Sequence, residues 1–331
     1  MSEPHTLALP LPRILLTRRW PAAVERNLAQ LFDVVLNQDD LPLGRERLKD
    51  AMTKFDIVCA TVSDRITSEV MMTPGRRVRL IASYGAGTDH IDLEAARACG
   101  LVVSNTPDVL TDATAELAVL LMMMVARRVS EGERELRAGQ WKGWRPTHLV
   151  GQSLRGRHLG LVGFGRIGQA TARLAQNAFG ARIAYYSSRR ASADVEAQFD
   201  ARHFASVQAL ASQVDVLSLH CPANPQTFHL VNAGLLAAMK PGAILINTAR
   251  GTVVDEDALA AALDQGVIAG AGLDVFEKEP AVNARLLASR NAVLLPHLGS
   301  ATEDARVGMG QRVVQNIVAY LAGQALPDRV A

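Results

Sequence analysis

A glycine-rich turn, Gly163-Phe164-Gly165-Arg166-Ile167-Gly168, has the residue types and spacing of an anion-binding site. It follows an apolar run that begins at His158 and leads into an alanine-rich stretch with helical periodicity. In such a turn the first glycine permits the sharp bend, the second lets the backbone approach a ligand, and the third lets the helix pack against its strand. The helix N-terminus then presents N–H groups and a positive dipole end to an anion. The turn therefore predicts a site for the pyrophosphate of a dinucleotide.

A glycine-rich turn before a helix can also be purely structural, so the neighbouring sequence decides between the two interpretations. Residues 182–186, Arg-Ile-Ala-Tyr-Tyr, supply a second strand at the distance that a strand, helix and second parallel strand require. This setting favours the dinucleotide interpretation.

Three titratable or charged residues, Arg250, Glu279 and His297, each follow a predicted strand in the same part of the chain. Loops at the carboxyl ends of parallel strands face the ligand, so these side chains can converge on one substrate. Singly, each has a structural explanation: a solvated arginine, an exposed carboxylate, a structural histidine. Their shared position around one cofactor site makes a catalytic set the better interpretation.

The first third of the chain alternates short apolar strands with longer amphipathic stretches, which predicts a parallel, doubly wound lobe. The strands are expected at residues 14–17, 34–36, 57–61, 80–83 and 102–104. This lobe lacks a dinucleotide fingerprint. Its one glycine-rich turn, Tyr84-Gly85-Ala86-Gly87-Thr88-Asp89, closes a strand, and its N–H groups either face a ligand or form a plain turn.

A second lobe surrounds the glycine-rich fingerprint, and its six predicted strands are the full dinucleotide-binding count. They are expected at residues 158–162, 182–186, 214–219, 243–247, 269–275 and 293–295. The last helix, residues 305–322, should return to the first lobe. We therefore predict an α/β protein of two doubly wound parallel-sheet lobes: a flavodoxin-like substrate-binding (catalytic) domain at residues 1–106 plus 300–331, and a Rossmann dinucleotide-binding domain at 107–299. The active site is expected in the cleft between them.

The composition is that of an ordinary soluble globular protein, with 49% hydrophobic and 21% charged residues among 331. The formal net charge is only +2, and the arginine pairs are scattered along the chain, so nucleic acid is not an expected partner.

Three widely spaced cysteines, Cys59, Cys99 and Cys221, argue against a disulfide framework and against a metal site. A reducing, cytoplasmic compartment is therefore expected. The apolar residues 7–12 lack a preceding basic region and are broken by prolines, so they do not predict a signal peptide. The longest apolar run, residues 117–126, is too short to span a membrane.

Four motifs in combination give the chain a family resemblance: Gly163-Phe164-Gly165-Arg166-Ile167-Gly168, Asn247-Thr248-Ala249-Arg250-Gly251, Gly272-Leu273-Asp274-Val275-Phe276 with Glu279-Pro280, and Pro296-His297-Leu298-Gly299-Ser300-Ala301. Over nearly its whole length the chain resembles the D-2-hydroxyacid dehydrogenases, and most of all their glyoxylate/hydroxypyruvate reductase branch. The resemblance implies an oxidoreductase that reduces a short 2-oxo acid to the 2-hydroxy acid by hydride transfer from NAD(P)H.

The resemblance also implies roles for the three strand-end residues. Arg250 would hold the substrate carboxylate and polarise the 2-oxo group, a planar, bidentate task that lysine performs poorly. His297 would protonate the carbonyl oxygen, and Glu279 would orient the imidazole and favour its protonated form. The N–H groups of Ala86 and Gly87 would bind the substrate carboxylate.

Further cofactor contacts are implied by the resemblance. Thr114 would lie near the nicotinamide end, Pro222 and Thr227 along the dinucleotide, and Asp274 beside the nicotinamide. The remaining contacts would come from the loops that carry the catalytic set, at Thr248, Ala249, Arg250, His297 and Gly299.

The end of the second fingerprint strand departs from the pattern of NAD-preferring relatives, which have an aspartate there for the adenosine ribose. Here Tyr186 is followed by Ser187, Ser188, Arg189 and Arg190. The serines remove the repulsion of a 2′-phosphate, and the arginines offer it charge-assisted hydrogen bonds. We therefore predict NADPH in preference to NADH, although both arginines can also be solvated residues that open the next helix.

A long apolar stretch, residues 115–128, predicts a helix that is hydrophobic on nearly all sides. Such a helix is buried either in a core or against another subunit, and a single small lobe would struggle to cover it. We therefore predict a homodimer built on this helix.

Two other kinds of protein fit the same fold. One is a dinucleotide-sensing corepressor or scaffold, but the intact set of Arg250, Glu279 and His297 favours the enzyme. The other is a dehydrogenase for D-lactate, phosphoglycerate, formate or phosphite. The missing ribose aspartate argues against a strictly NAD-dependent lactate enzyme, and the glutamate at position 279 argues against formate, for which this family has a glutamine.

Overall fold

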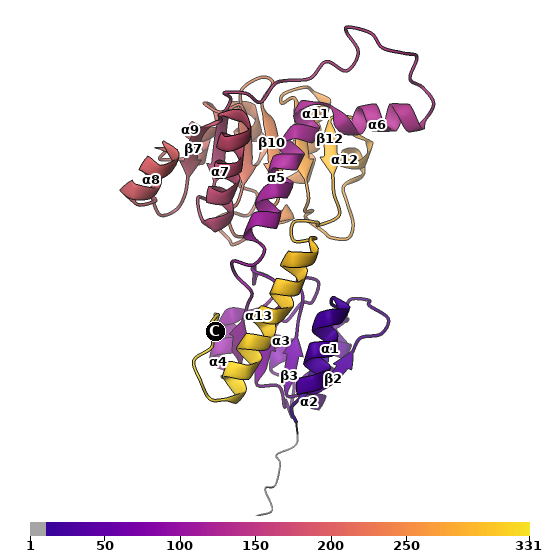
Figure 1. The fold of residues 1–331 in the computed structure, drawn as a ribbon, viewed down its shortest axis with the longest axis vertical. Coiled ribbons are helices and arrows are strands. Elements are labelled where there is room, and N and C mark those ends of the chain that lie inside the picture. Colours follow the sequence, from indigo (N-terminus) through magenta and orange to yellow (C-terminus); the bar gives the residue numbers. More distant parts are fainter. Residues whose placement is uncertain (1–10) are drawn as a thin grey trace, which may run out of the picture. The chain divides into compact units, whose positions relative to one another are not determined.

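The computed structural model describes residues 11–331, so the predictions for residues 7–10 lie outside it (Figure 1). The chain divides into two compact units. Unit 1 comprises Met1–Leu110 and Thr302–Ala331, and unit 2 comprises Thr111–Ala301. Both boundaries lie a few residues beyond the expected ones. The reason is local packing, because Val109 lies against Gly308 and Thr302 caps the last helix.

Unit 1 is built on a five-stranded parallel sheet in the order β2-β1-β3-β4-β5, which is the flavodoxin-like order. The strands are β1 Arg13–Leu16, β2 Asp33–Leu36, β3 Ile57–Cys59, β4 Leu80–Ala82 and β5 Val102–Ser104. The helices are α1 Ala22–Leu31, α2 Arg45–Lys54, α3 Ser68–Met71, α4 Leu93–Ala98 and α13 Glu303–Leu321. The central strands β3 and β4 are buried at every position, as expected for a parallel sheet covered on both faces.

Helix α13 belongs to unit 1 although it follows all of unit 2 in the chain (Figure 1). Thr302 begins the helix by accepting the N–H of Ala305 with its hydroxyl, 3.2 Å away. The helix packs closely on α1 at Gly310, where a Cβ would lie only 2.4 Å from a methyl group of Val24. The C-terminal strand-like segment then pairs with β5, since Val103 donates its N–H to the carbonyl oxygen of Ala331.

Unit 2 contains a seven-stranded parallel sheet in the order β12-β11-β10-β9-β6-β7-β8. The strands are β6 His158–Val162, β7 Arg182–Tyr186, β8 Arg202–His203, β9 Val216–Leu219, β10 Ile244–Asn247, β11 Gly270–Leu273 and β12 Ala292–Leu294. The prediction of six strands missed β8, which has two polar residues and therefore no apolar pattern. Strands β6 to β11 form the Rossmann order, and β12 is added at the edge.

The helices of unit 2 cover its sheet. They are α5 Thr111–Ala126, α6 Val129–Arg137, α7 Arg166–Phe179, α8 Ala193–Phe199, α9 Val207–Ala211, α10 Ala233–Ala238, the short 3₁₀ turn η1 Gly251–Val253, α11 Glu256–Asp264 and α12 Ala284–Ala288. Helix α5 approaches β11 closely, because a Cβ at Gly270 would lie 2.8 Å from a methyl group of Val125. The glycines of β11 therefore make room for this helix.

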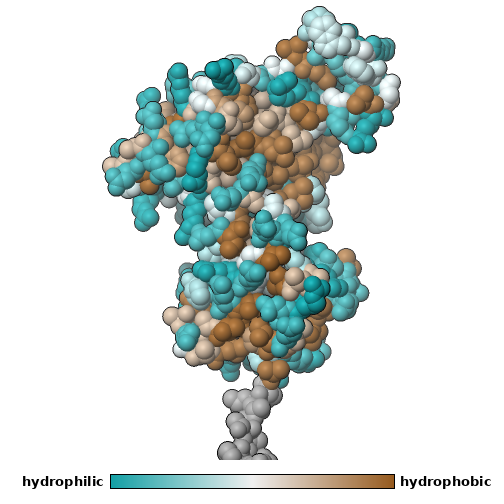
Figure 2. Space-filling model, in the orientation of Figure 1, coloured by the Kyte–Doolittle hydropathy of each residue, from teal (hydrophilic) through white to brown (hydrophobic). Residues whose placement is uncertain are grey.

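Helix α5 is the predicted apolar helix, and it ends at Ala126 because Arg128 adopts a left-handed conformation with φ of 54°. One face of α5, including Ala118, Leu121 and Val125, is buried in the core of unit 2. The core does not cover the whole helix, since Leu120 and Met123 remain 46% and 44% exposed. Figure 2 shows hydrophobic side chains on the face of unit 2 over which α5 runs.

Within residues 11–331, no helix is long and apolar enough to cross a membrane. The same residues contain no group of three or more histidine, cysteine, aspartate or glutamate side chains arranged to hold a metal ion. Cys59, Cys99 and Cys221 are free thiols.

Candidate active site

The glycine-rich turn of residues 163–168 joins β6 to α7, and each of its glycines has a distinct environment. Gly163 has φ of +94°, and a Cβ there would lie 2.6 Å from the carbonyl oxygen of His220. A Cβ at Gly168 would lie 2.4 Å from the carbonyl oxygen of Gly163. At Gly165 a Cβ would meet nothing within 4 Å. The first and third glycines are therefore required by packing, whereas the second faces open space where a ligand can approach the backbone.

The N-terminus of α7 is open towards this space. Gly165 is its N-cap residue and supplies no side-chain hydrogen bond, and the first turn contains no acidic residue. An anion near Arg166, Ile167 and Gly168 would thus meet the positive end of the helix dipole. The turn and the helix end fit the pyrophosphate of a nicotinamide dinucleotide.

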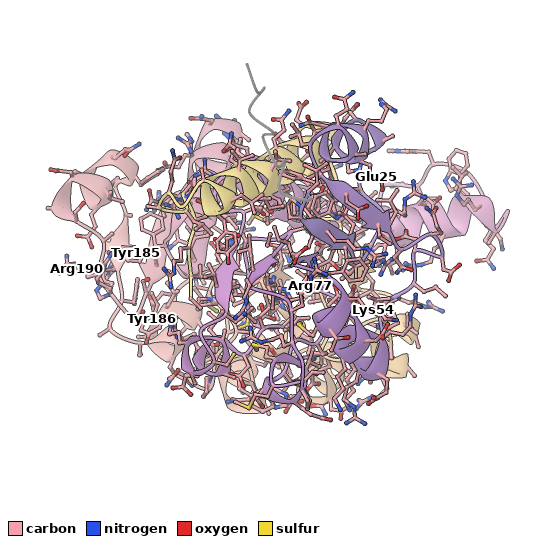
Figure 3. The ribbon with its side chains drawn as sticks, turned by 90° about the horizontal axis from the view of Figure 1, so that it is seen from below. Glu25, Lys54, Arg77, Tyr185, Tyr186 and Arg190 are labelled. Atoms are coloured by element: carbon pink, nitrogen blue, oxygen red, sulfur yellow. The ribbon has the colours of Figure 1, made fainter. Side chains whose placement is uncertain are left out.

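At the end of β7, Arg190 is engaged by the protein itself. Its guanidinium donates to both carboxylate oxygens of Glu196, each at 2.8 Å, and the hydroxyl of Tyr185 donates to the same carboxylate. The hydrogen bonds from Arg190 and Tyr185 lower the pKa of Glu196 to about 2. Figure 3 labels Tyr185, Tyr186 and Arg190 in this region. Arg189 is exposed and has no ion-pair partner in the part of the chain that the structure describes.

His297 and Glu279 form a hydrogen-bonded pair in unit 2, with 2.9 Å between imidazole Nδ1 and carboxylate Oε2. The other carboxylate oxygen of Glu279 accepts the N–H of Phe276, also at 2.9 Å. The two side chains are 29% and 35% exposed, so a substrate can reach them. This arrangement fixes the ring through Nδ1 and leaves Nε2 as the nitrogen available to a substrate.

The carboxylate of Glu279 is stabilised in its ionised form. Burial alone would raise its pKa, but the hydrogen bond and charge of His297, the Phe276 N–H and the charge of Arg250 together outweigh burial, so the pKa lies below its ordinary value. The loop that carries Arg250 touches the loop of Glu279, since a Cβ at Gly251 would lie 1.9 Å from the carbonyl carbon of Phe276. Unit 2 thus brings the three predicted catalytic residues together.

Asp274 holds the loop that carries His297. Its carboxylate is 1% exposed and accepts the N–H groups of Leu298 and Gly299 at 2.6 and 2.8 Å, while its carbonyl oxygen accepts the N–H of His297 at 2.9 Å. His297 needs this support because its φ of 56° is unusual for a residue with a side chain. The hydroxyl of Thr114 adds a 3.0 Å hydrogen bond to the carbonyl oxygen of Gly299. Asp274 and Thr114 therefore orient this loop, besides any contact with a cofactor.

Asn247, at the end of β10, organises the loop of Arg250 and was missed as a functional residue. Its side chain donates to the carbonyl oxygen of Arg250 at 2.9 Å and accepts the N–H of Ala249 at 3.0 Å. Its own carbonyl oxygen accepts the N–H of Asp274. An amide side chain closing a fully apolar strand is the sequence signal that could have identified it. Next to it, the buried hydroxyl of Thr248 has no hydrogen-bond partner among the described residues, which fits a predicted cofactor contact.

Pro222 and Thr227 lie in one turn after β9. The hydroxyl of Thr227 donates to the carbonyl oxygen of Pro222 at 2.7 Å, and its oxygen accepts the N–H of Asn224 at 2.9 Å. These hydrogen bonds close the turn on itself. The two residues predicted along the dinucleotide thus belong to a single local structure.

The glycine-rich turn of unit 1 follows β4. Thr106 donates its N–H to the carbonyl oxygen of Gly85 at 3.0 Å, and the side chain of Asn105 donates to the carbonyl oxygen of Ala86 at 2.7 Å. The N–H groups of Ala86 and Gly87 have no acceptor within residues 11–331. The hydrogen bonds to the carbonyl oxygens of Gly85 and Ala86 fix the turn, and its two neighbouring N–H groups suit a carboxylate ligand.

Comparison with known proteins places this geometry in a family. A model described as the D-isomer specific 2-hydroxyacid dehydrogenase, NAD binding domain, matches residues 119–299. The glyoxylate reductases of Thermococcus litoralis and Pyrococcus horikoshii are each 42% identical over 323 residues, which are 96% of both chains. Among solved structures, an NADPH-dependent glyoxylate/hydroxypyruvate reductase from Sinorhizobium meliloti, in complex with NADP and malonate, is 36% identical with a TM-score of 0.85 and 97% of each chain covered. A glyoxylate reductase from Paecilomyes thermophila is 31% identical, also with a TM-score of 0.85, covering 97% of this chain and 99% of that one.

The two parallel sheets and the glycine-rich turn define an α/β protein with a dinucleotide-binding domain, and the family match adds the class of oxidoreductase. Within that class, the chain belongs to the D-2-hydroxyacid dehydrogenase family. The predicted family and fold class are both confirmed.

Proposed function

We propose that the protein is a glyoxylate/hydroxypyruvate reductase that reduces the 2-oxo group of a short 2-oxo acid to a hydroxyl group. The observation that carries the proposal is the His297–Glu279 pair with Arg250 beside it, since it supplies a proton donor and a carboxylate-binding cation at one place. The names of the relatives support glyoxylate as the substrate.

In the proposed mechanism, Arg250 of unit 2 binds the substrate carboxylate and polarises the 2-oxo group. A reduced nicotinamide bound to unit 2 would supply the hydride for the new C–H bond. His297 donates a proton to the carbonyl oxygen and regains it from solvent. Glu279 stays ionised and holds the imidazole ring through Nδ1, which directs Nε2 to the carbonyl oxygen.

Residues of unit 2 would hold the cofactor. The glycine turn of residues 163–168 would bind the pyrophosphate, the turn of Pro222 and Thr227 would line the dinucleotide, and Thr248 would face it with its unpartnered hydroxyl. Ala249 and Gly299 would contribute backbone contacts near the catalytic set.

We further propose a preference for NADPH over NADH. Ser187 and Ser188 place no negative charge at the end of β7, and Arg189 is available to a 2′-phosphate. Arg190 is a weaker candidate than the sequence suggested, because Glu196 already binds its guanidinium. The NADPH-dependent relative from Sinorhizobium meliloti supports the proposal.

A spectrophotometric panel tests the function. Glyoxylate, hydroxypyruvate, pyruvate and phosphohydroxypyruvate are each offered with NADPH and with NADH, and oxidation of the cofactor is followed at its absorption band. The proposal expects the highest kcat/KM for glyoxylate or hydroxypyruvate with NADPH. Preference for pyruvate or phosphohydroxypyruvate would instead assign a lactate or phosphoglycerate dehydrogenase. Cofactor binding without turnover of any of the four acids would favour a dinucleotide-sensing corepressor or scaffold.

We also propose a reducing, cytoplasmic location for the protein. We further propose that it forms a homodimer through α5. Leu120 and Met123 expose apolar surface on α5, and Leu136 and Trp144 expose 60% and 82% of their surface on the following segment. Burial of such side chains against a second copy is favourable at about 25 cal/mol per Å². A sedimentation experiment at micromolar concentration should show a dimer, and Met123→Glu should shift the equilibrium towards the monomer. A wild-type monomer would refute the proposal.

A further inference from the structure

Another histidine–glutamate pair, His229 with Glu277, has its glutamate in the same loop as Glu279. Nε2 of His229 and Oε1 of Glu277 are 2.7 Å apart, and their side chains are 31% and 22% exposed. Glu277 precedes Glu279 by only two residues. None of the roles proposed above uses His229 or Glu277.

His229 is itself fixed by backbone contacts. It donates its N–H to the carbonyl oxygen of Thr252 at 2.9 Å, and Val231 donates to the carbonyl oxygen of Val253 at 3.0 Å. The segment that carries His229 is thus paired with the turn that follows Arg250. His229 has a φ of 48°. This is an uncommon backbone conformation for a residue with a side chain, and it persists where the surrounding structure holds it.

The turn after Arg250 also packs directly on the loop of Glu277. A Cβ at Gly251 would lie 1.9 Å from the carbonyl carbon of Phe276 and 2.3 Å from the nitrogen of Glu277. No side chain fits at this position, so the two backbones are in direct contact. Three segments, residues 229–231, 250–253 and 276–279, therefore form one packed cluster within unit 2.

Glu277 is held at two points. Its carboxylate binds His229, and its N–H donates to Oε1 of Glu256 at 2.7 Å. Glu256 stands at the start of α11 and is 6% exposed, so it provides a rigid anchor. The next anchor along the loop is the carboxylate of Glu279, which accepts the N–H of Phe276. Glu277 is therefore joined to the catalytic carboxylate within four residues of backbone, because Phe276 on its other side donates its N–H to Glu279.

On these contacts we propose that His229 and Glu277 are positioning residues, which set the place of Glu279 and through it the orientation of the His297 imidazole. The proposal deepens the proposed reductase function and rests on it for its kinetic consequence. Its structural consequence, a defined position of the His297 ring, does not depend on the substrate. Neither residue touches the substrate in this role.

The kinetic test compares His229→Ala and Glu277→Ala with the wild type. Both should lower kcat by about 10- to 100-fold, because a small misplacement of a catalytic group has an effect of this size. The KM for the cofactor and the melting temperature should stay near their wild-type values. Lys278→Ala is the matched control, because Lys278 lies between the two glutamates and its side chain is exposed. His229→Gln should restore part of the loss, since the amide can still donate to Glu277.

Coupling separates positioning from general destabilisation. If His229 acts through Glu279, adding His229→Ala to a Glu279→Gln enzyme should cause little further loss of kcat. Losses that multiply in the double variant, or an unchanged kcat in both single variants, would overturn the proposal. Should Glu277→Ala fail to fold, His229→Ala and Glu277→Gln give the same comparison with a smaller change at residue 277.

A readout without turnover keeps the two proposals distinguishable. In protein labelled with ¹⁵N-histidine, the eight histidines give a small set of ring signals, and the one that His297→Ala removes belongs to His297. His229→Ala should shift that signal, whereas Lys278→Ala should not. If the wild type turns over no 2-oxo acid while His229→Ala still shifts the His297 signal, the reductase function alone is refuted. An unmoved His297 signal would refute the positioning role alone.

Discussion

The His297 imidazole is bound at Nδ1 by Glu279, and this leaves Nε2 for the substrate. We expect His297→Ala to lower kcat by about 100-fold or more, since general acid catalysis contributes factors of this size. Cofactor affinity, measured by fluorescence titration of the reduced dinucleotide, should change little. Near-normal turnover in this variant would show that another group donates the proton.

Glu279 has a lowered pKa, so its carboxylate remains charged at neutral pH and is protonated at a lower pH than an ordinary glutamate. In Glu279→Gln the imidazolium loses a negative partner that favours it. We therefore expect a lower kcat, and the pH above which turnover declines should move downwards. Rate profiles between about pH 5 and pH 10 would measure both effects. A profile that keeps its shape and position would count against the pairing.

Arg189 and Arg190 differ in their partners, and this gives a directional prediction about cofactor choice. Arg189→Ala should lower the ratio of kcat/KM for NADPH over NADH by about tenfold or more, because one charged hydrogen bond contributes on the order of 1.5 to 3 kcal/mol. Arg190→Ala should lower it less, since Glu196 binds that guanidinium. Equal ratios in wild type and Arg189→Ala would leave Arg189 without a role in cofactor choice.

Among the elements, the turn between β6 and α7 offers two glycines with opposite expectations. A methyl group at Gly168 would lie 2.4 Å from the carbonyl oxygen of Gly163, whereas one at Gly165 would meet nothing. Gly168→Ala should therefore lower the melting temperature by several degrees. Gly165→Ala should keep the wild-type melting temperature but weaken cofactor binding, because its methyl group would enter the open space in which we propose that the pyrophosphate binds. Calorimetry and dinucleotide titration of both variants distinguish stability from binding.

The elements also show how far sequence patterns reach. Apolar strands and the glycine spacing predicted both sheets and the dinucleotide turn, because these signals are local in the chain. Strand β8 has no apolar pattern and exists only by pairing with β7, so it was missed. The ion pair between Glu196 and Arg190 forms across a turn whose geometry the sequence does not specify. Likewise, the hydrogen bonds of Asn247 join two loops that only the folded sheet brings together.

Across the whole molecule, arginines lower the pKa of carboxylates in both units. Glu25, labelled in Figure 3, is paired with Arg19 in unit 1, and Glu196 is paired with Arg190 in unit 2. A glutamate whose pKa is lower in the folded than in the unfolded protein stabilises the fold at pH values above its unfolded pKa. This contribution is lost as the pH falls towards the folded pKa, which is about 2 for Glu196. The melting temperature should thus fall between roughly pH 5 and pH 2. Glu196→Gln should have a lower melting temperature than wild type at neutral pH, and this difference should shrink as the pH falls through this range. A difference in melting temperature that stays constant with pH would exclude the titration of Glu196 as its cause.

Three of the four margins of the two sheets are short or covered. In unit 2 the outermost strands, β8 and β12, have two and three residues, against four or five in the strands between them. In unit 1 the outer side of β5 is covered by the end of the chain, since Val103 and Asn105 donate their N–H groups to Ala331 and Asp328. Exposed strand edges are the usual templates for edge-to-edge aggregation. These three margins therefore offer little template for fibril-like stacking between copies.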